Sequence, residues 1–489
     1  MGCNINPLFL TFIIFMTLSC SKDQKPNSIF YENHAQYKQE GLDNRRFNHS
    51  KIKPLILSLE SQPGFSVKEA GKSVQGKEIY LVSIGKGKNT VLLWSQMHGD
   101  ESTATMALMD IFNFFKSSDE LDSLRQIIFD NLTIHFLPML NPDGADVFKR
   151  RNALDIDLNR DALRLQSPEA KILKAVRDSI DADFGFNLHD QNTRYTAGKS
   201  NKPATISFLA PAFDEEKSID PGREKAMKLV VEMNSALQKH IPGQVGKYSD
   251  EFEPRAFGDN IQKWGTNTVL IESGGYLDDP QKQYIRKLNF AAIMEGLLSI
   301  ATASYSKNTV EEYFAIPNNE LYLYNLMIRE VLVEENGKEY TVDLGINREE
   351  VNTKDNRNFY YKSVIEDMGD LSVFYGYEEI DTKGMKAEPG KVYPDVFQNM
   401  KEIKELNFHE LLAEGYTTVR VKKLPKKSFV SFPLNVVGQG LNISNEIALN
   451  AAPNFVLRKG GNVKYAVVNG FIYDIDAKKS MVKNALVSE

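Results

Sequence analysis

Short apolar runs alternate with longer stretches of helical period between residues 89 and 303. The runs read VLLW, LTIHFLPML, FGFNL and TVLIES. The helical stretches begin at or near four places in the chain: Ser102, Ser167-Pro168-Glu169, Pro221 and Pro280. Buried strands alternating with amphipathic helices are typical of a sheet that carries helices on its faces. The pattern therefore predicts an α/β fold for this part of the chain.

The pattern differs on both sides of this region. Residues 29–63 read as helical, and residues 67–84 read as a hairpin with Gly71 and Gly76 at turn positions. Beyond about residue 306 the chain consists of β-branched and aromatic runs separated by turn signals, among them YLYNLMIREVLVE, TTVRVKKL and VKYAVVNGFIYDI. We therefore expect four parts: a signal peptide (1–20), a tether and helical lead-in (21–66), an α/β domain (67–305) and a β-rich domain without an assigned function (306–489).

Length and composition agree with more than one domain and exclude some partners. The chain has 489 residues, whereas a single domain usually holds roughly 100 to 200. Its formal net charge is -6, from 59 basic and 65 acidic residues without a long block of one sign, so we expect no nucleic-acid partner. The two cysteines are Cys3 and Cys20. The folded body therefore has no thiol for a disulfide, and any metal must be bound by His, Asp or Glu.

The N-terminus predicts export from the cytoplasm. Residues Leu8 to Leu18 form an apolar run that is too short to span a bilayer but has the length of a signal-peptide core. The run ends in Thr17-Leu18-Ser19-Cys20, which resembles a bacterial lipoprotein cleavage box with Cys20 as the lipidated residue. Two acyl anchors hold a protein on a membrane where one does not. We expect a lipid-anchored protein of the cell envelope, periplasmic or on the cell surface; a plain secretory signal and a secreted protein are the alternative.

Three residues are candidate ligands of a metal ion. His98 and Glu101 are three positions apart in MHGDE, so both side chains can turn toward one ion. His189 follows FGFNL and is expected at the same carboxyl edge of the sheet, where α/β folds place their crevices. A catalytic zinc site needs three protein ligands of this kind and one open position. A single HxxE pair is a weak signal in a long chain, and other motifs are needed to support it.

Four further segments supply such motifs. They are Asn141-Pro142-Asp143-Gly144, Arg150-Arg151-Asn152, Asp157-Leu158-Asn159-Arg160-Asp161 and Ile271-Glu272-Ser273-Gly274-Gly275. Together with HGDE and the LHD histidine, and in this order, they resemble the zinc carboxypeptidase family of metallopeptidases. The resemblance covers residues 67–303 approximately. It implies a mixed, mostly parallel twisted sheet flanked by helices, followed in this chain by the β-rich C-terminal domain.

The resemblance also implies roles for individual residues. One Zn²⁺ per chain would be held by His98, Glu101 and His189, and Glu272 would be the general base for the water on that zinc. Desolvation at the end of an apolar strand is expected to raise the pKa of the base. Arg150 or its neighbour Arg151 would stabilise the oxyanion. Asn159 and Arg160 would bind the terminal carboxylate of the substrate. Asp157 would hydrogen-bond the first zinc histidine.

These roles predict a zinc-dependent metallocarboxypeptidase that acts on peptides with a free C-terminus. Tyr248 is the nearest candidate for the mobile-loop tyrosine of the family. The alternatives are a murein-peptide amidase or an acyl-amino-acid deacylase that uses the same site, and a catalytically inactive surface lipoprotein that binds peptides or glycans. The presence of all three ligands and of Glu272 speaks against the inactive protein.

Overall fold

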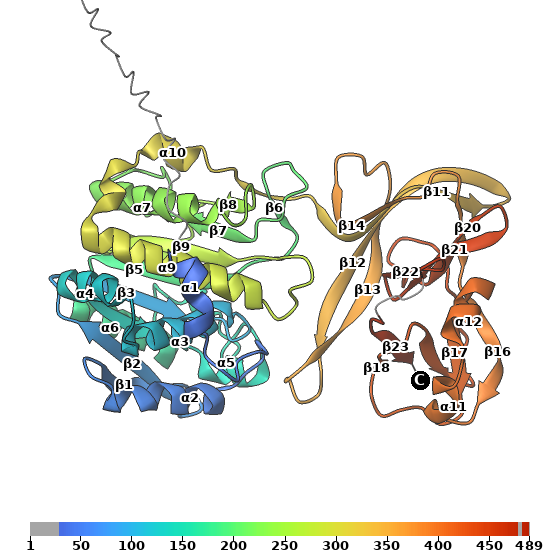
Figure 1. Cartoon of the computed structure of the whole chain (residues 1–489), viewed down its shortest axis with the longest axis horizontal. Helices are drawn as coiled ribbons and strands as arrows, with labels where there is room; N and C mark the ends of the chain where they lie inside the picture. Colours follow the sequence, from blue (N-terminus) through green and yellow to red (C-terminus); the bar gives the residue numbers. More distant parts are fainter. Residues whose placement is uncertain (1–28, 478–481, 489) are drawn as a thin grey trace, which may run out of the picture.

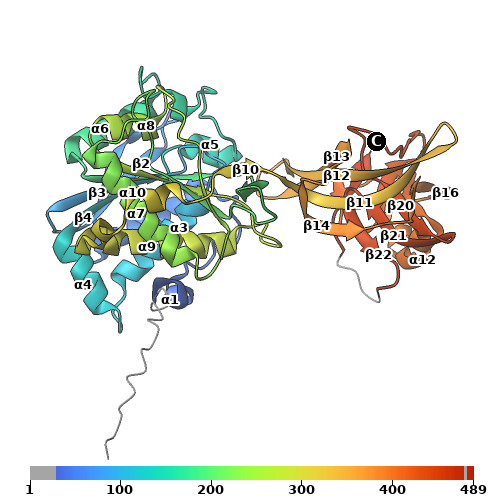
Figure 2. The same ribbon diagram turned by 90° about the horizontal axis from the view of Figure 1, so that it is seen from above.

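The computed structural model describes residues 29–477 and 482–488 and consists of two lobes (Figure 1). The predicted signal peptide and Cys20 lie outside these residues. The first lobe contains an eight-stranded sheet with helices, and the second contains two β-sheets with two short helices. Figure 2 shows that the connection between the lobes is narrow at β10. Within the described residues, no helix combines the length and the apolar character that crossing a bilayer requires.

The eight-stranded sheet is mixed, as the resemblance implies. Its strands lie in the order β1-β2-β4-β3-β5-β9-β7-β8. β3 is parallel to β4 and β5, β5 is parallel to β9, and β7 is parallel to β8, whereas the other three pairs are antiparallel. The strands span β1 (Ser66–Lys72), β2 (Glu78–Gly85), β3 (Asn89–Ser95), β4 (Leu132–Leu137), β5 (Phe184–Asp190), β7 (Ile206–Leu209), β8 (Val245–Lys247) and β9 (Asn267–Ser273). The four apolar runs of the sequence are thus β3, β4, β5 and β9.

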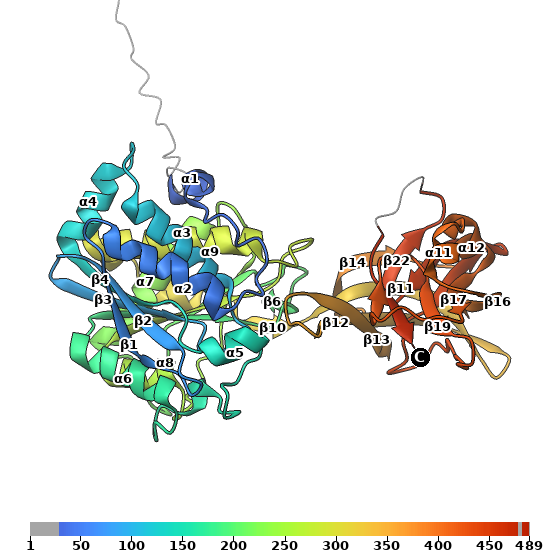
Figure 3. The same ribbon diagram turned by 90° about the horizontal axis from the view of Figure 1, so that it is seen from below.

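Helices cover both faces of this sheet (Figure 3). Because successive side chains of a strand point to opposite faces, Val91 and Leu93 of β3 belong to one core and Leu92 and Trp94 to another. The larger core includes residues of α1 (Ile29–Tyr37), α2 (His49–Leu57), α3 (Thr103–Lys116), α4 (Asp122–Asn131), α7 (Pro221–Leu237) and α9 (Gln283–Thr302). The core on the other face includes residues of α6 (Pro168–Ile180) and α8 (Phe257–Lys263).

The predicted helix starts are confirmed at three places and shifted at the fourth. α3 begins directly after Ser102, α6 begins at Pro168, and α7 begins at Pro221, but α9 begins only at Gln283. Residues 29–63 are not one helix, because residues 38–48 separate α1 from α2. The hairpin of β1 and β2 is confirmed with Gly76 in its turn, whereas Gly71 lies at an irregularity of the strand pairing.

The β-rich character of the C-terminal region is confirmed. β10 (Asn319–Leu321) pairs with β6 (Tyr195–Ala197) of the first lobe. The chain then forms a sheet in the order β13-β12-β11-β15-β20-β21-β22, with β14 beside β11, and a sheet in the order β16-β17-β19-β23-β18. The bounds are β11 (Leu323–Glu335), β12 (Lys338–Asn352), β13 (Phe359–Gly369), β14 (Tyr375–Asp381), β15 (Lys386–Pro389), β16 (Lys391–Phe397), β17 (Tyr416–Val421), β18 (Phe429–Val430), β19 (Asn435–Gly438), β20 (Phe455–Lys459), β21 (Asn462–Val468), β22 (Phe471–Asp474) and β23 (Ala485–Ser488), with helices α11 (Met400–Lys404) and α12 (Phe408–Glu414).

The β12–β13 hairpin contacts the first lobe through two buried arginines. Arg45 and Arg46 both bind the carboxylate of Glu350 near the end of β12, the latter with 2.7 Å between Nη2 and Oε2. The Arg46 guanidinium lies 4.3 Å from the ring centre of Phe148 in the first lobe and 4.1 Å from that of Phe359 in the second. These contacts hold the hairpin against the segment that precedes α2.

Candidate active site

The carboxyl ends of β3, β5 and β9 bring the candidate residues together. These three strands are neighbours and parallel, so their carboxyl ends lie at one edge of the sheet. His189 of β5 lies directly opposite Glu272 of β9 in the register of the pair. His98 and Glu101 lie in the loop that joins β3 to α3. Four residues from three distant segments therefore meet at this edge.

The loop that carries His98 is held by the segment Asn141–Gly144. Asn141 is the N-cap of α5 (Pro142–Val147), and its Nδ2 also donates to the carbonyls of Met97 and Arg150. Gly99 lies so close to this helix that a side chain there would place its Cβ 2.1 Å from the backbone carbon of Gly144. The glycines of HGDE and NPDG thus permit the close approach that positions the first histidine.

The three candidate ligands converge on one point. Glu101 lies 2.7 Å from the Nδ1 of His98 through one carboxylate oxygen and 2.7 Å from the Nδ1 of His189 through the other. The two imidazole nitrogens are 3.2 Å apart, and one ligand atom from each residue lies within 4.8 Å of the others. All three residues are buried. Two imidazoles and one carboxylate form a donor set that suits zinc and leaves a fourth position open, so these residues fit the metal.

A second group of residues orients the ligands. The Nε2 of His98 lies 3.1 Å from Asp157, whose other carboxylate oxygen accepts from the Nε of Arg150 at 3.0 Å. Such a partner fixes the tautomer of a metal-binding histidine. Burial lowers the pKa of His98, but Glu101 and Asp157 outweigh it and raise this pKa to about 9. Burial raises the pKa of Asp157, but His98 and Arg150 outweigh it and hold this pKa well below its ordinary value.

Glu272 is buried beside the candidate metal ligands, and one of its carboxylate oxygens lacks a hydrogen-bond partner among the described residues. Its Oε2 has no hydrogen-bond partner in the described part of the chain. Burial, followed by the charges of Glu101 and Asp190, raises the pKa of Glu272 well above 4.5. The expected effect of desolvation on this carboxyl is thus confirmed. A carboxyl with a raised pKa holds a proton more readily than an exposed carboxyl, which suits a group that accepts a proton and returns it.

A cavity of about 220 Å³ connects these residues with the other candidates. Arg150, Asn159, Arg160 and Tyr248 line it together with His98, Glu101, His189 and Glu272. Arg150 contacts Glu101 at 3.1 Å, whereas the neighbouring Arg151 is exposed and donates to the carbonyl of Asp155. The arginine that faces the cavity is therefore Arg150.

Asn159 and Arg160 lie on a 3₁₀ turn (Leu158–Arg160) that lines this cavity. The Oδ1 of Asn159 accepts from the backbone N–H of Phe257 at 2.9 Å. Arg160 lies 3.2 Å from Glu253 and keeps 38% of its side chain exposed. Its guanidinium is therefore held in place but still accessible to a carboxylate in the cavity. Tyr248 lines the same cavity, and burial and then the charge of Glu272 raise the pKa of its hydroxyl.

Sequence reasoning missed several residues that shape the site. The backbone N–H of Asp190 donates to Glu101 at 3.2 Å, and the Asp190 carboxylate binds Lys282 at 3.0 Å. Lys282 also donates to the carbonyl of Ser273 at 2.9 Å. Four further carboxylic residues, from the segment 250–259, also line the small cavity: Asp250, Glu251, Glu253 and Asp259. The position of Asp190 next to His189 was a signal in the sequence, whereas Lys282 and Asp259 carry no motif of their own.

Comparison with known proteins gives one family. Residues 57–204 match the zinc carboxypeptidase family. Carboxypeptidase SOL1 of Arabidopsis thaliana is 33% identical over 135 residues, which are 24% of this chain and 28% of the plant protein. An uncharacterised protein of Zymomonas mobilis is 26% identical over 220 residues, which are 44% of this chain and 52% of that protein. The chain thus matches only part of the length of these relatives.

Solved structures of similar proteins include a metallo-carboxypeptidase from Burkholderia cenocepacia. It has a TM-score of 0.43 and 17% sequence identity, and the alignment covers 53% of this chain and 70% of that structure. A metallo-carboxypeptidase from Pseudomonas aeruginosa has a TM-score of 0.42 and 17% identity, with 55% of this chain and 70% of that structure covered.

Proposed function

We propose that this chain, whose residues 57–204 match the zinc carboxypeptidase family, is a metallocarboxypeptidase that removes the C-terminal residue of peptides. One observation carries the proposal. His98, Glu101 and His189 converge at a sheet edge where the buried Glu272 and the guanidinium of Arg160 line the same cavity. Peptide hydrolysis at a C-terminus requires these three elements: a metal site, a proton acceptor and a group that recognises the terminal carboxylate.

The metal site would hold one zinc ion through the Nδ1 atoms of both histidines and the carboxylate of Glu101. Zinc at such a site polarises a carbonyl and lowers the pKa of water toward 7. Glu272 accepts the proton from the attacking water and passes it to the leaving amine, and its raised pKa supports both steps. Arg150, held by Asp157 and Glu101, presents a fixed positive charge where the oxyanion develops.

The terminal carboxylate of the substrate would bind Arg160 and Asn159. A guanidinium offers two parallel hydrogen bonds to a carboxylate, which favours a chain end over an internal peptide. The residue to be released then lies in the 220 Å³ cavity beside the four carboxylic residues. This arrangement supports an exopeptidase.

We further propose that the enzyme acts in the cell envelope, anchored by a lipid on Cys20. The apolar run from Leu8 to Leu18 and the following cleavage box support this location. In the envelope, general peptides and the stem peptides of murein are both accessible substrates. A murein-peptide amidase or a deacylase of acyl-amino acids would use the same metal site.

The test is zinc content together with hydrolysis of a panel of substrates by the purified protein. We expect about one zinc per chain and release of the last residue from linear peptides with a free C-terminus. Muropeptides and acyl-amino acids in the same panel distinguish the alternatives by relative kcat/KM. A protein that binds zinc and hydrolyses none of the panel would be the inactive binding protein instead.

A variant of Arg160 tests the exopeptidase assignment. We expect Arg160→Ala to raise KM by about tenfold or more for peptides with a free C-terminus, because a charge-assisted bidentate contact is lost. The effect on the same peptides with an amidated C-terminus is expected to be small. Arg151→Ala is the matched control, since Arg151 is exposed and binds only a backbone carbonyl. Equal effects of Arg160→Ala on both peptide series would contradict the role.

A further inference from the structure

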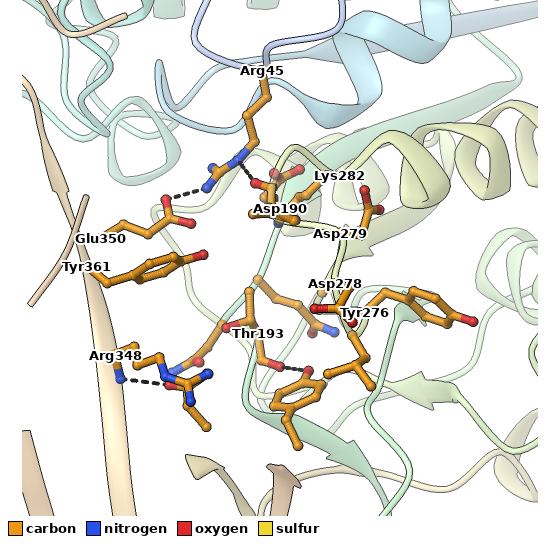
Figure 4. Close-up of a pocket in the computed structure, with 18 of the residues that line it drawn as sticks. Arg45, Asp190, Thr193, Tyr276, Asp278, Asp279, Lys282, Arg348, Glu350 and Tyr361 are labelled. Atoms are coloured by element: carbon orange, nitrogen blue, oxygen red, sulfur yellow. Dashed lines mark hydrogen bonds and ion pairs between the residues drawn. The ribbon is translucent and has the colours of Figure 1, made fainter. Parts of the chain in front are cut away.

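A second and larger cavity lies between the two lobes and borders the first. Its volume is about 820 Å³, and its walls include Glu101 and Arg150, which also line the catalytic cavity. The wall from the first lobe also includes the loop after His189 (Asp190 to Thr193) and residues of the segment from Gly274 to Lys282. Figure 4 shows this cavity with residues of both lobes around it.

The opposite wall comes from the β-rich domain. It includes Arg348 and Glu350 of β12, Tyr361 of β13, Phe471 of β22 and Lys483. This wall is fixed against the catalytic domain on both sides. Glu350 binds Arg45 and Arg46, and the Tyr377 hydroxyl donates to the carbonyl of Thr193 in the loop after His189. These contacts join the two walls of the cavity.

The direction of a bound substrate leads into this cavity. In the proposed function the terminal carboxylate binds Arg160 in the small cavity, and the scissile bond lies near Glu101 and Arg150. Both cavities have Glu101, Arg150 and Asp190 in their walls, so they meet beside the metal-site residues. Residues that precede the scissile bond must then extend toward the β-rich domain. A volume of 820 Å³ suits a segment of several residues, since pockets of roughly 300 to 1,000 Å³ enclose drug-sized ligands.

The chemistry of the walls suits an uncharged polar peptide chain. The cations are mostly paired inside the cavity: Lys282 with Asp190, Arg348 with Glu378, and Arg45 and Arg46 with Glu350. Tyr361 is directed into the cavity in Figure 4; its ring packs edge-on against Phe359 and Phe471, and its hydroxyl forms no hydrogen bond to another described residue. An aromatic ring with a free hydroxyl can contact an apolar side chain with the ring and, at the same time, hydrogen-bond a peptide group with the hydroxyl.

We propose that the β-rich domain forms the far wall of the binding site for the residues on the N-terminal side of the scissile bond, so that the enzyme prefers peptides of several residues to dipeptides. The inference rests on the proposed function and adds the substrate class. It assigns the C-terminal half of the chain a role in substrate binding, with Tyr361 as a contact residue.

The test compares two substrates that share their last two residues. One is an N-acetylated dipeptide, and the other is an N-acetylated hexapeptide extended with Ala, Gly and Ser. We expect the wild-type protein to hydrolyse the hexapeptide with a kcat/KM at least about tenfold higher than that for the dipeptide. A difference of this size corresponds to one favourable contact with the additional residues. Tyr361→Ala is expected to bring the ratio of the kcat/KM for the hexapeptide to that for the dipeptide close to one. Tyr361→Phe, which keeps the ring, is expected to lower this ratio by about threefold.

Tyr340→Ala is the matched control, because Tyr340 lies on β12 of the same domain with 49% of its surface exposed and does not line the cavity. In the Tyr340→Ala protein, the ratio of the kcat/KM for the hexapeptide to that for the dipeptide is expected to equal the ratio in the wild type. Binding of a fluorescent hexapeptide to the Glu272→Gln protein, with and without Tyr361→Ala, gives a readout without turnover, and we expect about tenfold weaker binding in the double variant.

The outcomes separate the two proposals. Hydrolysis of both substrates with equal kcat/KM, or a ratio that survives Tyr361→Ala and Tyr361→Phe, overturns the role of the β-rich domain and leaves the carboxypeptidase assignment intact. Hydrolysis of neither substrate overturns the carboxypeptidase assignment, and this inference with it. A ratio that falls equally in Tyr340→Ala also overturns the role of the cavity.

Discussion

Glu272 combines deep burial with an unpaired oxygen, which is costly for a residue that has only a structural role. A buried polar atom without a partner typically costs about 1 to 3 kcal/mol. At Glu272 this cost accompanies a raised pKa next to three candidate metal ligands. Perturbed carboxyls of this kind are typical of proton-transfer sites.

We therefore expect Glu272→Gln to retain zinc and to lower kcat by at least about 100-fold, the usual contribution of a general base. The amide keeps the shape of the side chain but cannot accept the proton. Zinc content by atomic absorption and kcat on a free peptide are the measurements. Glu216→Gln, at an exposed position of the same domain, is the control. Full activity of the Glu272→Gln protein would remove the residue from the mechanism.

Asp259 gives the small cavity a pH-dependent charge. Burial, followed by the charge of Glu253, raises the pKa of Asp259 to about 7. The carboxyl is thus neutral below this pH and charged above it. A terminal lysine or arginine of the substrate in this cavity gains an ion pair only with the charged form.

We expect the preference for a terminal lysine over a terminal leucine to increase between pH 6 and pH 8. Asp259→Asn is expected to abolish the increase and to lower kcat/KM for lysine by about tenfold at pH 8. The ratio of kcat/KM for the two peptides across this range is the measurement. Asp395→Asn, at an exposed position of β16, controls for a general effect of charge. A ratio that stays constant with pH in the wild type contradicts the role of Asp259.

At the scale of elements, Ser167 and Asp161 start α6. The Ser167 hydroxyl accepts from the N–H of Ala170 at 3.2 Å and donates to Asp161 at 2.8 Å. Asp161 also accepts from the N–H groups of Gln166 and Ser167. The aspartate at the end of the DLNRD segment therefore connects the turn of Asn159 and Arg160 to the helix.

We expect Ser167→Ala to destabilise the catalytic domain by about 1 to 2 kcal/mol, because a helix cap and a buried hydrogen bond are both lost. The midpoint of urea unfolding, followed by circular dichroism, measures the effect. Ser179→Ala near the end of the same helix is the control, since Ser179 is exposed. An effect of Ser167→Ala no larger than that of the control would show that Asp161 alone starts the helix.

The elements that the sequence predicts well are those whose signal is local. β3, β5 and β9 are buried on both faces, so their residues form continuous apolar runs, and a capping serine followed by proline marks α6. Because the ends of parallel strands coincide, the meeting of His98 with His189 could also be predicted. The pairing order of the C-terminal strands could not be, because β15 pairs with β20 across a long stretch of intervening chain.

Side-chain direction is the other limit of sequence reasoning. Arg150 and Arg151 are adjacent and chemically equal, and only the turn after α5 decides that Arg150 faces Glu101. Lys282, the N-cap residue of α9, has a left-handed backbone conformation and binds Asp190. Arg45 and Arg46, in the segment between α1 and α2, bind Glu350 of a hairpin some 300 residues later. None of these determinants is present in a local pattern.

At the scale of the whole molecule, Glu350 links the lobes and makes their contact dependent on pH. Burial raises the pKa of Glu350, but Arg45 and Arg46 outweigh it and hold this pKa below its ordinary value of 4.5. The stabilisation is therefore complete above about pH 4.5 and is lost as the pH falls through the lower value in the folded protein.

We expect Glu350→Gln to lower the melting temperature at pH 7 by several degrees, because hydrogen bonds to charged groups contribute about 1.5 to 3 kcal/mol and two buried arginines lose their partner. The difference from the wild type is expected to shrink as the pH falls below 4.5. Differential scanning calorimetry at pH 7 and pH 3.5 measures both effects. Glu349→Gln is the control, because the neighbouring Glu349 forms no ion pair with another described residue. A difference in melting temperature that does not change with pH would contradict a stabilising contribution of the ion pair.

The pairing of Arg45 and Arg46 with Glu350 also sets a delay during biosynthesis. Translation at about 5 to 20 residues per second separates the emergence of the two arginines from that of Glu350 by about 15 to 60 seconds. A chain that reached the fold of its first lobe within this interval would present a surface with two guanidinium groups beside Phe148, without the carboxylate that pairs them. A chaperone or a translocation partner with an acidic segment could occupy this surface until the hairpin arrives, and crosslinking from position 46 in stalled chains shorter than 350 residues would identify it.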